Sequence, residues 1–234
     1  MKKWILGAHC ALVTACVLGT SIASAQTAAP EDKTPDHAKF AGRFGVGYFG
    51  VSDVPIATPG NNSTTVPAPV VGMRYWLQPD MGIDVGVGLY YLSGSTSAGG
   101  TSVDTPSVGA ILLHGGLPFA LASSKHFTFE LIPELNLGYA SSTVKGTAGA
   151  PDDSLSGLRV DLGARVGAEI HFGFIGIPEL ALEASVGAFL GYRKTTESPS
   201  GASSNSISST QFSTTSFNNP WDIFRSSIAA RYYL

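Results

Sequence analysis

Apolar and polar side chains alternate along the chain from residue 40 onward, with a period of two residues rather than 3.6. This period is typical of strands, whose successive side chains point to opposite sides. In 158–172 every second residue from Leu158 to Phe172 is apolar. In 107–117 both parities are apolar, so the register of that segment stays open. The alternation predicts eight strands, over residues 40–50, 70–78, 82–92, 107–117, 127–139, 158–172, 180–193 and 224–234.

The connections between these segments alternate in length. Short joins alternate with long stretches rich in Pro, Gly, Ser, Thr and Asn. We expect long loops near 52–69, 93–106, 140–156 and 194–219. Short turns on one side and long loops on the other, with an even number of strands, are typical of outer-membrane barrels. The fold class predicted for 40–234 is therefore all-β, an eight-stranded antiparallel up-and-down transmembrane β-barrel.

Aromatic residues recur at the ends of the apolar faces. If the odd-numbered strands all run outward, four tyrosines form one ring just before the long loops, where an amphipathic side chain is stable at a membrane interface. A second aromatic ring is expected at the opposite end. The predicted girdles consist of Tyr48, Tyr91, Tyr139 and Tyr192 at the loop end, and of Phe40, Tyr75, Phe127, Phe172 and Tyr232 at the turn end.

The distribution of charge indicates which face meets lipid. Only 13% of the 234 residues are charged, where about 25% is usual. Every arginine falls on the polar parity of a predicted strand, and the apolar parity carries no charged residue. This favours a membrane barrel, because an outward Lys or Arg costs about 2–4 kcal/mol at the bilayer midplane. A soluble lipocalin-like carrier with an apolar cavity stays as an alternative.

The polar parity places both signs of charge inside the barrel. An eight-stranded barrel is just wide enough for side chains to fill, and an unpaired buried charge is costly. We therefore expect an arginine–carboxylate network that fills the lumen, with a narrow water-filled pore for small solutes as the alternative. The predicted network consists of Arg43, Arg74, Asp84, Glu130, Glu134, Arg159, Asp161, Arg165, Glu169, Glu183, Arg193, Arg225 and Arg231.

The first 39 residues differ from the rest. Lys2 and Lys3 precede an apolar stretch, and Ala23-Ser24-Ala25 supplies small residues, so 1–25 is predicted to be a secretory signal peptide. Lipoprotein processing at Cys16 is the alternative. Residues 26–39 are polar and contain proline, which predicts a periplasmic N-terminal tail.

The last strand, from Ser226 to Leu234, resembles the C-terminal signature by which the assembly machinery recognises bacterial outer-membrane proteins, although it ends in leucine rather than Phe or Trp. With the signal peptide and eight strands, the chain is similar to the small barrels of the outer membrane protein A transmembrane-domain and outer membrane protein X type. This resemblance implies a location in the outer membrane of a Gram-negative bacterium. It also implies contact with outer-membrane lipid and lipopolysaccharide, assembly through the C-terminal strand, and a structural or surface-interaction role.

No residue pattern points to catalysis, a cofactor or a metal. Gly45-x-Gly47-x-x-Gly50 resembles a dinucleotide fingerprint, but the prolines that follow exclude the helix that it needs. Of the five histidines, the four that follow the predicted signal peptide show no metal-ligand spacing: His37, His114, His126 and His171. The formal net charge of −3 argues against nucleic acid as a partner. A lipid-modifying outer-membrane enzyme is the least favoured alternative, and the partner of the Ser/Thr-rich loop 194–219 is unknown.

Overall fold

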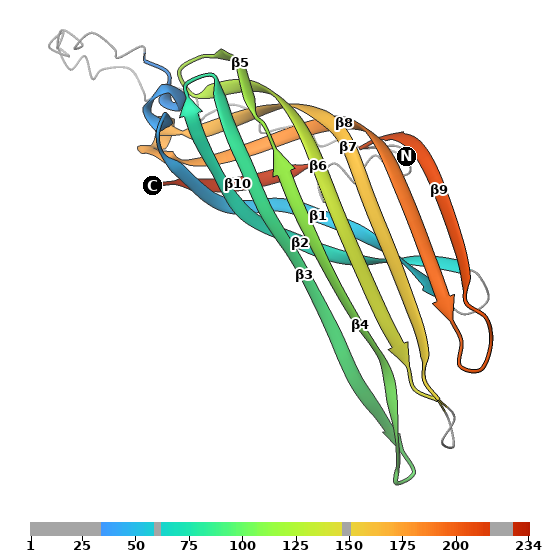
Figure 1. Cartoon of the computed structure of the whole chain (residues 1–234). Coiled ribbons are helices and arrows are strands. Elements are labelled where there is room, and N and C mark those ends of the chain that lie inside the picture. Colours follow the sequence, from blue (N-terminus) through green and yellow to red (C-terminus); the bar gives the residue numbers. More distant parts are fainter. Residues whose placement is uncertain (1–33, 59–61, 147–150, 216–226) are drawn as a thin grey trace, which may run out of the picture. The chain divides into compact units, whose positions relative to one another are not determined.

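The computed structural model describes residues 34–58, 62–146, 151–215 and 227–234. They form one antiparallel sheet and two short 3-10 helices (Figure 1). No helix among these residues is long and apolar enough to cross a membrane. The elements are η1 (Asp36–Phe40), β1 (Phe44–Thr58), β2 (Asn62–Gln78), β3 (Met81–Ala98), β4 (Thr101–Gly116), β5 (Phe119–Ser123), β6 (Phe127–Val144), β7 (Asp153–Phe172), η3 (Gly173–Ile175), β8 (Ile177–Ser198), β9 (Asn205–Thr214) and β10 (Ile228–Tyr233).

The sheet closes on itself because β10 pairs with β1 on one side and with β8 on the other. The ring thus runs through eight strands in the order β10-β1-β2-β3-β4-β6-β7-β8. The fourth predicted segment, 107–117, ends with β4 at Gly116, and β5 follows it in a stretch predicted to be a short join. The last predicted segment, 224–234, contains β10, whereas β9 lies in the stretch 194–219 that the sequence predicts to be a loop. The first residues of the predicted strand 224–234 lie outside the described residues, as does the predicted signal peptide 1–25.

Side-chain burial follows the predicted alternation. Most large apolar residues on the outward face are between 37% and 74% exposed and the others are half-buried, while the charged residues between them are largely buried inside the ring. The structure also settles the register of the fourth segment. Ile111 and Leu113 point outward, and Leu112 and His114 point inward. The two faces of the sheet are therefore chemically opposite, with the apolar face outside.

The stretches predicted to be loops are mostly strand. At the end of the ring opposite the short turns, here called the hairpin end, paired strands continue into all four of these stretches. Gly99 and Gly100, both with positive φ, leave only a two-residue turn between β3 and β4. Ser- and Thr-rich sequence lacks an apolar face, so its composition indicates a loop even where the backbone pairs as a hairpin.

The β1–β2 hairpin closes the hairpin end of the ring from inside. The pairing of β1 shifts between Tyr48 and Val51, where Gly50 has a φ of 96°, and such a bulge bends a strand. Beyond it, β1 packs against the opposite wall: a Cβ on Gly157 would lie 1.8 Å from the carbonyl oxygen of Pro55. The hairpin, β4, β6 and β7 share an apolar core of Phe49, Val54, Ile56, Ala57, Val66, Ala68, Val70, Ala110, Leu112, Ala140 and Leu155.

The other end of the ring, the turn end, is closed by η1. The Asp36 amide donates to the carbonyl of Lys125 at 2.8 Å, and the Gly42 amide donates to the carbonyl of Trp76 at 2.7 Å. The predicted tail 26–39 therefore ends in a folded segment. Phe40, predicted to face lipid in a strand, is instead 2% exposed and lies stacked on Tyr233 inside the ring. The chain turns between η1 and β1, so Phe40 does not share the parity of the strand that follows.

Candidate functional site: the charged interior of the ring

A buried ionic cluster fills the ring near the turn end. Arg74 on β2 donates two hydrogen bonds of 2.7 Å to both oxygens of Asp84, its register partner on β3. It donates a third, also 2.7 Å long, to Glu130 on β6, and its side chain is 0% exposed. One guanidinium therefore links three strands through the interior, in the bidentate geometry that favours Arg over Lys.

Arg231 on β10 completes this cluster. Its two terminal nitrogens donate to Glu169 on β7 and Glu183 on β8, each at 2.5 Å. Both carboxylates also accept from Arg74 at 3.2 Å. All four of these charged side chains are 0% exposed. The cluster ties the closing strand to its neighbours across the middle of the ring.

A second charged group lies farther toward the hairpin end. Arg165 on β7 donates to Glu134 on β6 at 2.6 Å, and the Asn136 amide donates to the same carboxylate at 2.9 Å. The Nδ1 atom of His114 lies 2.8 Å from the Asn136 oxygen. All four side chains are largely buried. They form a hydrogen-bonded chain from β7 across β6 to β4.

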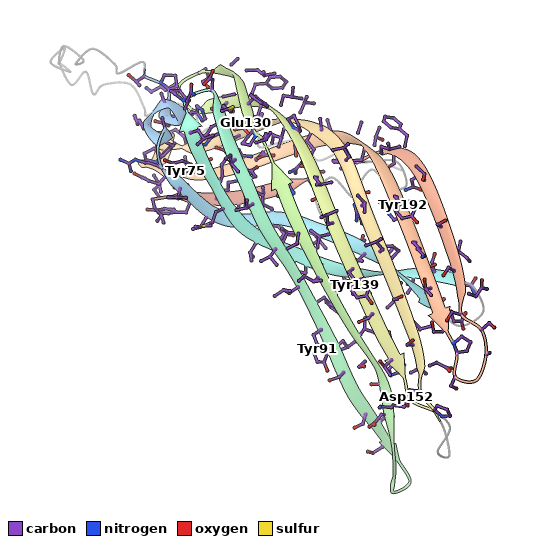
Figure 2. The ribbon with its side chains drawn as sticks, in the orientation of Figure 1. Tyr75, Tyr91, Glu130, Tyr139, Asp152 and Tyr192 are labelled. Atoms are coloured by element: carbon purple, nitrogen blue, oxygen red, sulfur yellow. The ribbon has the colours of Figure 1, made fainter. Side chains whose placement is uncertain are left out.

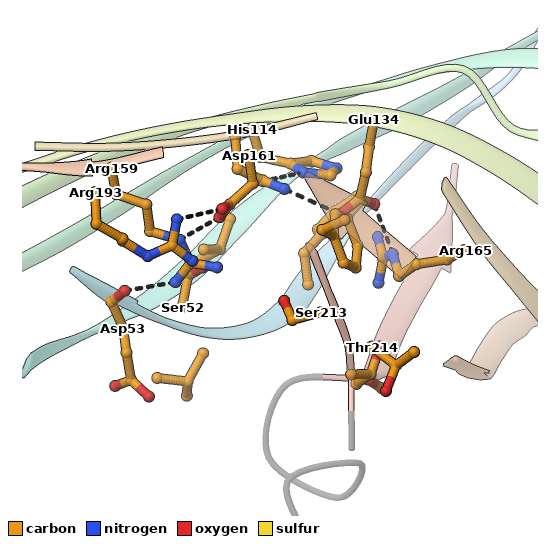
Figure 3. Close-up of a pocket in the computed structure, with 17 residues that line it drawn as sticks. Ser52, Asp53, His114, Glu134, Arg159, Asp161, Arg165, Arg193, Ser213 and Thr214 are labelled. Atoms are coloured by element: carbon orange, nitrogen blue, oxygen red, sulfur yellow. Dashed lines mark hydrogen bonds and ion pairs between the residues drawn. The ribbon is translucent and has the colours of Figure 1, made fainter. Parts of the chain in front are cut away.

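A polar cavity of about 190 Å³ separates this group from the β1–β2 hairpin (Figure 3). Arg159 and Arg193, neighbours on β7 and β8, both donate to the carboxylate of Asp161. Arg159 also donates to the carbonyl oxygen of Asp53 at 2.5 Å. Among the described residues, three arginines line this cavity, and each of them donates a hydrogen bond to a carboxylate.

Two of the predicted network residues lie elsewhere. Arg43 is exposed just before β1, at the turn end, so it is not part of the buried network. Arg225 lies outside the described residues. The other predicted members line the interior, in the two groups described above: Arg74, Asp84, Glu130, Glu169, Glu183 and Arg231 near the turn end, and Glu134, Arg159, Asp161, Arg165 and Arg193 at the cavity.

The aromatic residues of the predicted girdles, except Phe40, lie on strands with their side chains exposed or half-buried. Figure 2 shows Tyr91, Tyr139 and Tyr192 in one band across β3, β6 and β8, and Tyr75 near the turn end. Tyr48 shares the outward parity of β1. At the turn end the outward aromatic residues on strands are Tyr75, Phe127, Phe172 and Tyr232.

The hydrogen bonds around η1 set its charge state. Burial raises the pKa of Asp36, but hydrogen bonds from His126 and Lys39 outweigh burial and hold that pKa below its usual value. Burial lowers the pKa of His37. η1 thus carries a neutral imidazole beside an ionised carboxylate.

At the hairpin end, a hydrogen bond from Lys145 lowers the pKa of the exposed Asp152 carboxyl.

Sequence reasoning missed several residues of the interior. Trp76 and Tyr233 lie on the inward parity, where the sequence predicts polar residues, and the Trp76 indole donates to the Tyr233 hydroxyl at 3.1 Å. Trp76 lies two residues after Arg74, and Tyr233 two residues after Arg231, so each shares the inward parity of its arginine, and this parity could have identified both. His37 and His171 lie in contact range inside the turn end, with ring centroids 6.1 Å apart. They are too distant in sequence for spacing to show this.

No protein-family model and no curated protein matches the chain. Among solved structures, the chain is similar to Ail, the attachment invasion locus protein of Yersinia pestis. The sequence identity is 12% and the TM-score 0.39, and the match covers 82% of this chain and 97% of that chain. So distant a likeness carries no functional information, and the fold described above rests on the strand pairings alone.

Proposed function

We propose that the chain is an eight-stranded transmembrane β-barrel of the bacterial outer membrane, with a closed lumen and a structural or surface-interaction role. The observation that carries this proposal is the inverted distribution of side chains. Leu89, Leu162 and Leu190 are at least 54% exposed on the outward face, while Arg74, Glu169 and Arg231 are buried inside. Exposed apolar surface of this extent marks a membrane or interaction surface.

The length of the outward face fits a bilayer. On β6, Phe127 and Tyr139 lie 12 residues apart with Phe129, Leu135 and Leu137 exposed between them. At about 3.3 Å per residue and a strand tilt near 40°, this span is about 30 Å high. That height is close to the thickness of a hydrocarbon core. The aromatic residues at both ends would lie at the two interfaces.

The interior favours a closed barrel over the pore alternative. η1, the ionic cluster and the β1–β2 hairpin fill the ring at successive levels. An ion or solute would have to break charge-assisted hydrogen bonds of 2.7 Å between Arg74 and Asp84 to pass. The same ionic interior argues against the soluble carrier alternative, because a carrier of apolar ligands places its apolar residues inside.

The surface role is assigned to the hairpin end. β3 continues for seven residues beyond Tyr91 as a hairpin with β4, and β8 continues beyond Tyr192 paired with β9. These extensions would stand outside the bilayer on a rigid base, where binding residues tend to lie. The proposed contacts of the remaining surface are outer-membrane lipid and lipopolysaccharide at the apolar face, and the barrel assembly machinery at β10. The proposal includes no catalytic role.

Gel electrophoresis of the refolded chain tests the proposal. A compact barrel resists detergent until heated, so unheated and boiled samples should migrate differently, and the chain should remain insoluble without detergent or lipid. Planar-bilayer recording then separates the closed barrel from the pore. We expect no conductance steps from heat-modifiable protein, whereas regular steps would refute a closed lumen. Identical migration before and after heating, with solubility in plain buffer, would instead support the soluble carrier.

A further inference from the structure

Two histidines and one glutamate from distant segments meet at the turn end of the interior. His37 belongs to η1, and Glu169 and His171 lie on consecutive inward positions of β7. One ring nitrogen of each histidine and one carboxylate oxygen of Glu169 lie within 4.8 Å of one another, and all three residues are buried. Imidazole nitrogen and carboxylate oxygen are both ligands of zinc in proteins.

The backbone fixes which ring nitrogens carry hydrogen. His37 Nε2 lies 2.6 Å from the carbonyl oxygen of Pro79, and His171 Nδ1 lies 3.2 Å from that of Pro178. A carbonyl oxygen can only accept, so both of these nitrogens must donate. In the neutral imidazoles, the opposite nitrogens, His37 Nδ1 and His171 Nε2, are left with free lone pairs. A backbone carbonyl that holds the far nitrogen is the arrangement that orients histidine ligands in metal sites.

Neither of these lone pairs is satisfied by the protein. His37 Nδ1 and His171 Nε2 are buried and accept no hydrogen bond. His171 Nε2 lies 3.2 Å from Oε1 of Glu169, so when the imidazole is neutral two acceptors face each other across a short gap. Buried polar atoms without a partner are rare in proteins. The geometry therefore calls for a positive centre between the imidazoles and the carboxylate.

The charge of the surrounding cluster also favours a bound cation. Within the described residues, the cluster holds the four carboxylates of Asp84, Glu130, Glu169 and Glu183 against the two guanidiniums of Arg74 and Arg231. With every carboxylate ionised and both imidazoles neutral, the formal excess is two negative charges in a buried interior, where unpaired charge is costly. One divalent cation would balance this excess, and Glu169, which contacts both arginines, joins the cluster to the histidines.

We propose that His37, Glu169 and His171 bind one zinc ion, which fastens the N-terminal segment to the end of the barrel. Neighbouring side chains hold the three proposed ligands in place. The Tyr233 hydroxyl donates to Glu169 Oε1 at 2.8 Å and orients the carboxylate. Phe40 stacks on the His171 ring with centroids 5.1 Å apart, and the Trp76 ring lies edge-on to His37 at 4.3 Å. These ring contacts limit the movement of both ligands.

Zinc binding by the full chain, without a histidine tag and refolded into detergent micelles, tests this inference. Zn²⁺ is supplied either during or after refolding, unbound metal is removed by desalting, and the zinc content per chain is measured. The variants are His37→Gln and His171→Gln. His114→Gln is the matched control, since His114 is a buried histidine of the second group, bonded to Asn136. Heat-modifiable migration reports folding of every variant separately from its metal content.

We expect one zinc ion per wild-type chain and per His114→Gln chain, and affinity weakened by at least about 100-fold in His37→Gln and His171→Gln. The absorption spectrum of Co²⁺-loaded wild-type protein and the zinc-edge X-ray absorption fine structure should show two imidazole ligands. These two spectra need no variant, so they decide the question even if a variant fails to fold. Folded wild-type protein that takes up no zinc by either route, or zinc whose binding is unchanged in both histidine variants, would overturn the inference while leaving the barrel proposal intact.

Discussion

Replacement of Arg74 by methionine tests whether the interior charges stabilise the barrel. Methionine retains much of the aliphatic volume but removes the guanidinium, which donates to four carboxylates from β3, β6, β7 and β8. Of the two guanidiniums that the described residues place against these carboxylates, Arg231 alone would then remain. Arg43→Met is the matched control, because Arg43 is an exposed arginine at the same end of the barrel.

The structure sets the expected magnitude. Removal of one partner from a buried ion pair costs about 3–5 kcal/mol, because the other charge stays buried without compensation. Arg74 makes two 2.7 Å bonds to Asp84 and a third to Glu130 with all side chains 0% exposed, so we expect the upper part of this range. An exposed substitution such as Arg43→Met should change stability by no more than about 0.5 kcal/mol.

The assay is reversible urea unfolding of protein inserted in lipid vesicles, followed by the heat-modifiable band rather than by fluorescence, since Arg74 lies 5.4 Å from the Trp76 ring. A double-mutant cycle with Asp84→Asn isolates the pair, and its coupling should be about 1–3 kcal/mol. The reasoning is refuted if Arg74→Met and Arg43→Met unfold within about 1 kcal/mol of each other. That outcome would mean that water or protons compensate the buried acids.

Three further substitutions probe other parts of the barrel. Leu135→Arg, on the outward face between the girdles, should lower the free energy of unfolding by about 2–4 kcal/mol. Ile207→Arg, on the exposed strand β9 beyond the tyrosine band, should lower it by about 0–1 kcal/mol. Equal urea midpoints for the two variants would contradict the lipid-facing assignment. Gly157→Ala should displace the β1–β2 hairpin, since its Cβ would lie 1.8 Å from a backbone atom of β1. Gly115→Ala is the control, because a Cβ there meets nothing within 4 Å. Limited proteolysis should cut the hairpin faster in Gly157→Ala than in Gly115→Ala. Arg165→Met leaves its buried carboxylate partner unpaired and should lower the melting temperature in micelles, and an unchanged melting temperature would speak against pairing there.

The sequence predicts well what parity alone decides. Glu130 lies between apolar neighbours on a strand, and a charged side chain is excluded from the apolar outward face, so parity predicts that Glu130 points inward. Parity cannot predict the choice of partner. Arg74 contacts Glu169 and Glu183, which are 95 and 109 residues away in sequence, because ring closure brings β2 opposite β7 and β8. The meeting of His37 with His171 is non-local in the same way.

Composition misleads where a segment has no apolar face. Strand β9 is exposed at nearly every position, so nothing in its side chains distinguishes it from a loop, and only its backbone pairing with β8 makes it a strand. The opposite error occurs at Phe40, an aromatic residue assigned by parity to the outward face of the first predicted strand, which packs inside because the chain turns before β1 begins. Alternation predicts a strand only where the two faces meet different surroundings.

The three closures of the lumen rest on different forces, which has a consequence for how the barrel could open. The hairpin is held by apolar packing around Val54 and Leu112, the middle by the buried guanidiniums of Arg74 and Arg231, and the turn end by the hydrogen bonds of η1. High salt screens exposed charges but scarcely affects buried ones, so a change of salt concentration alone does not weaken all three. A path through the barrel needs every level to move at once, so local loosening at either end still leaves the ionic layer across the lumen. This arrangement favours a barrel that acts through its hairpins rather than through its interior.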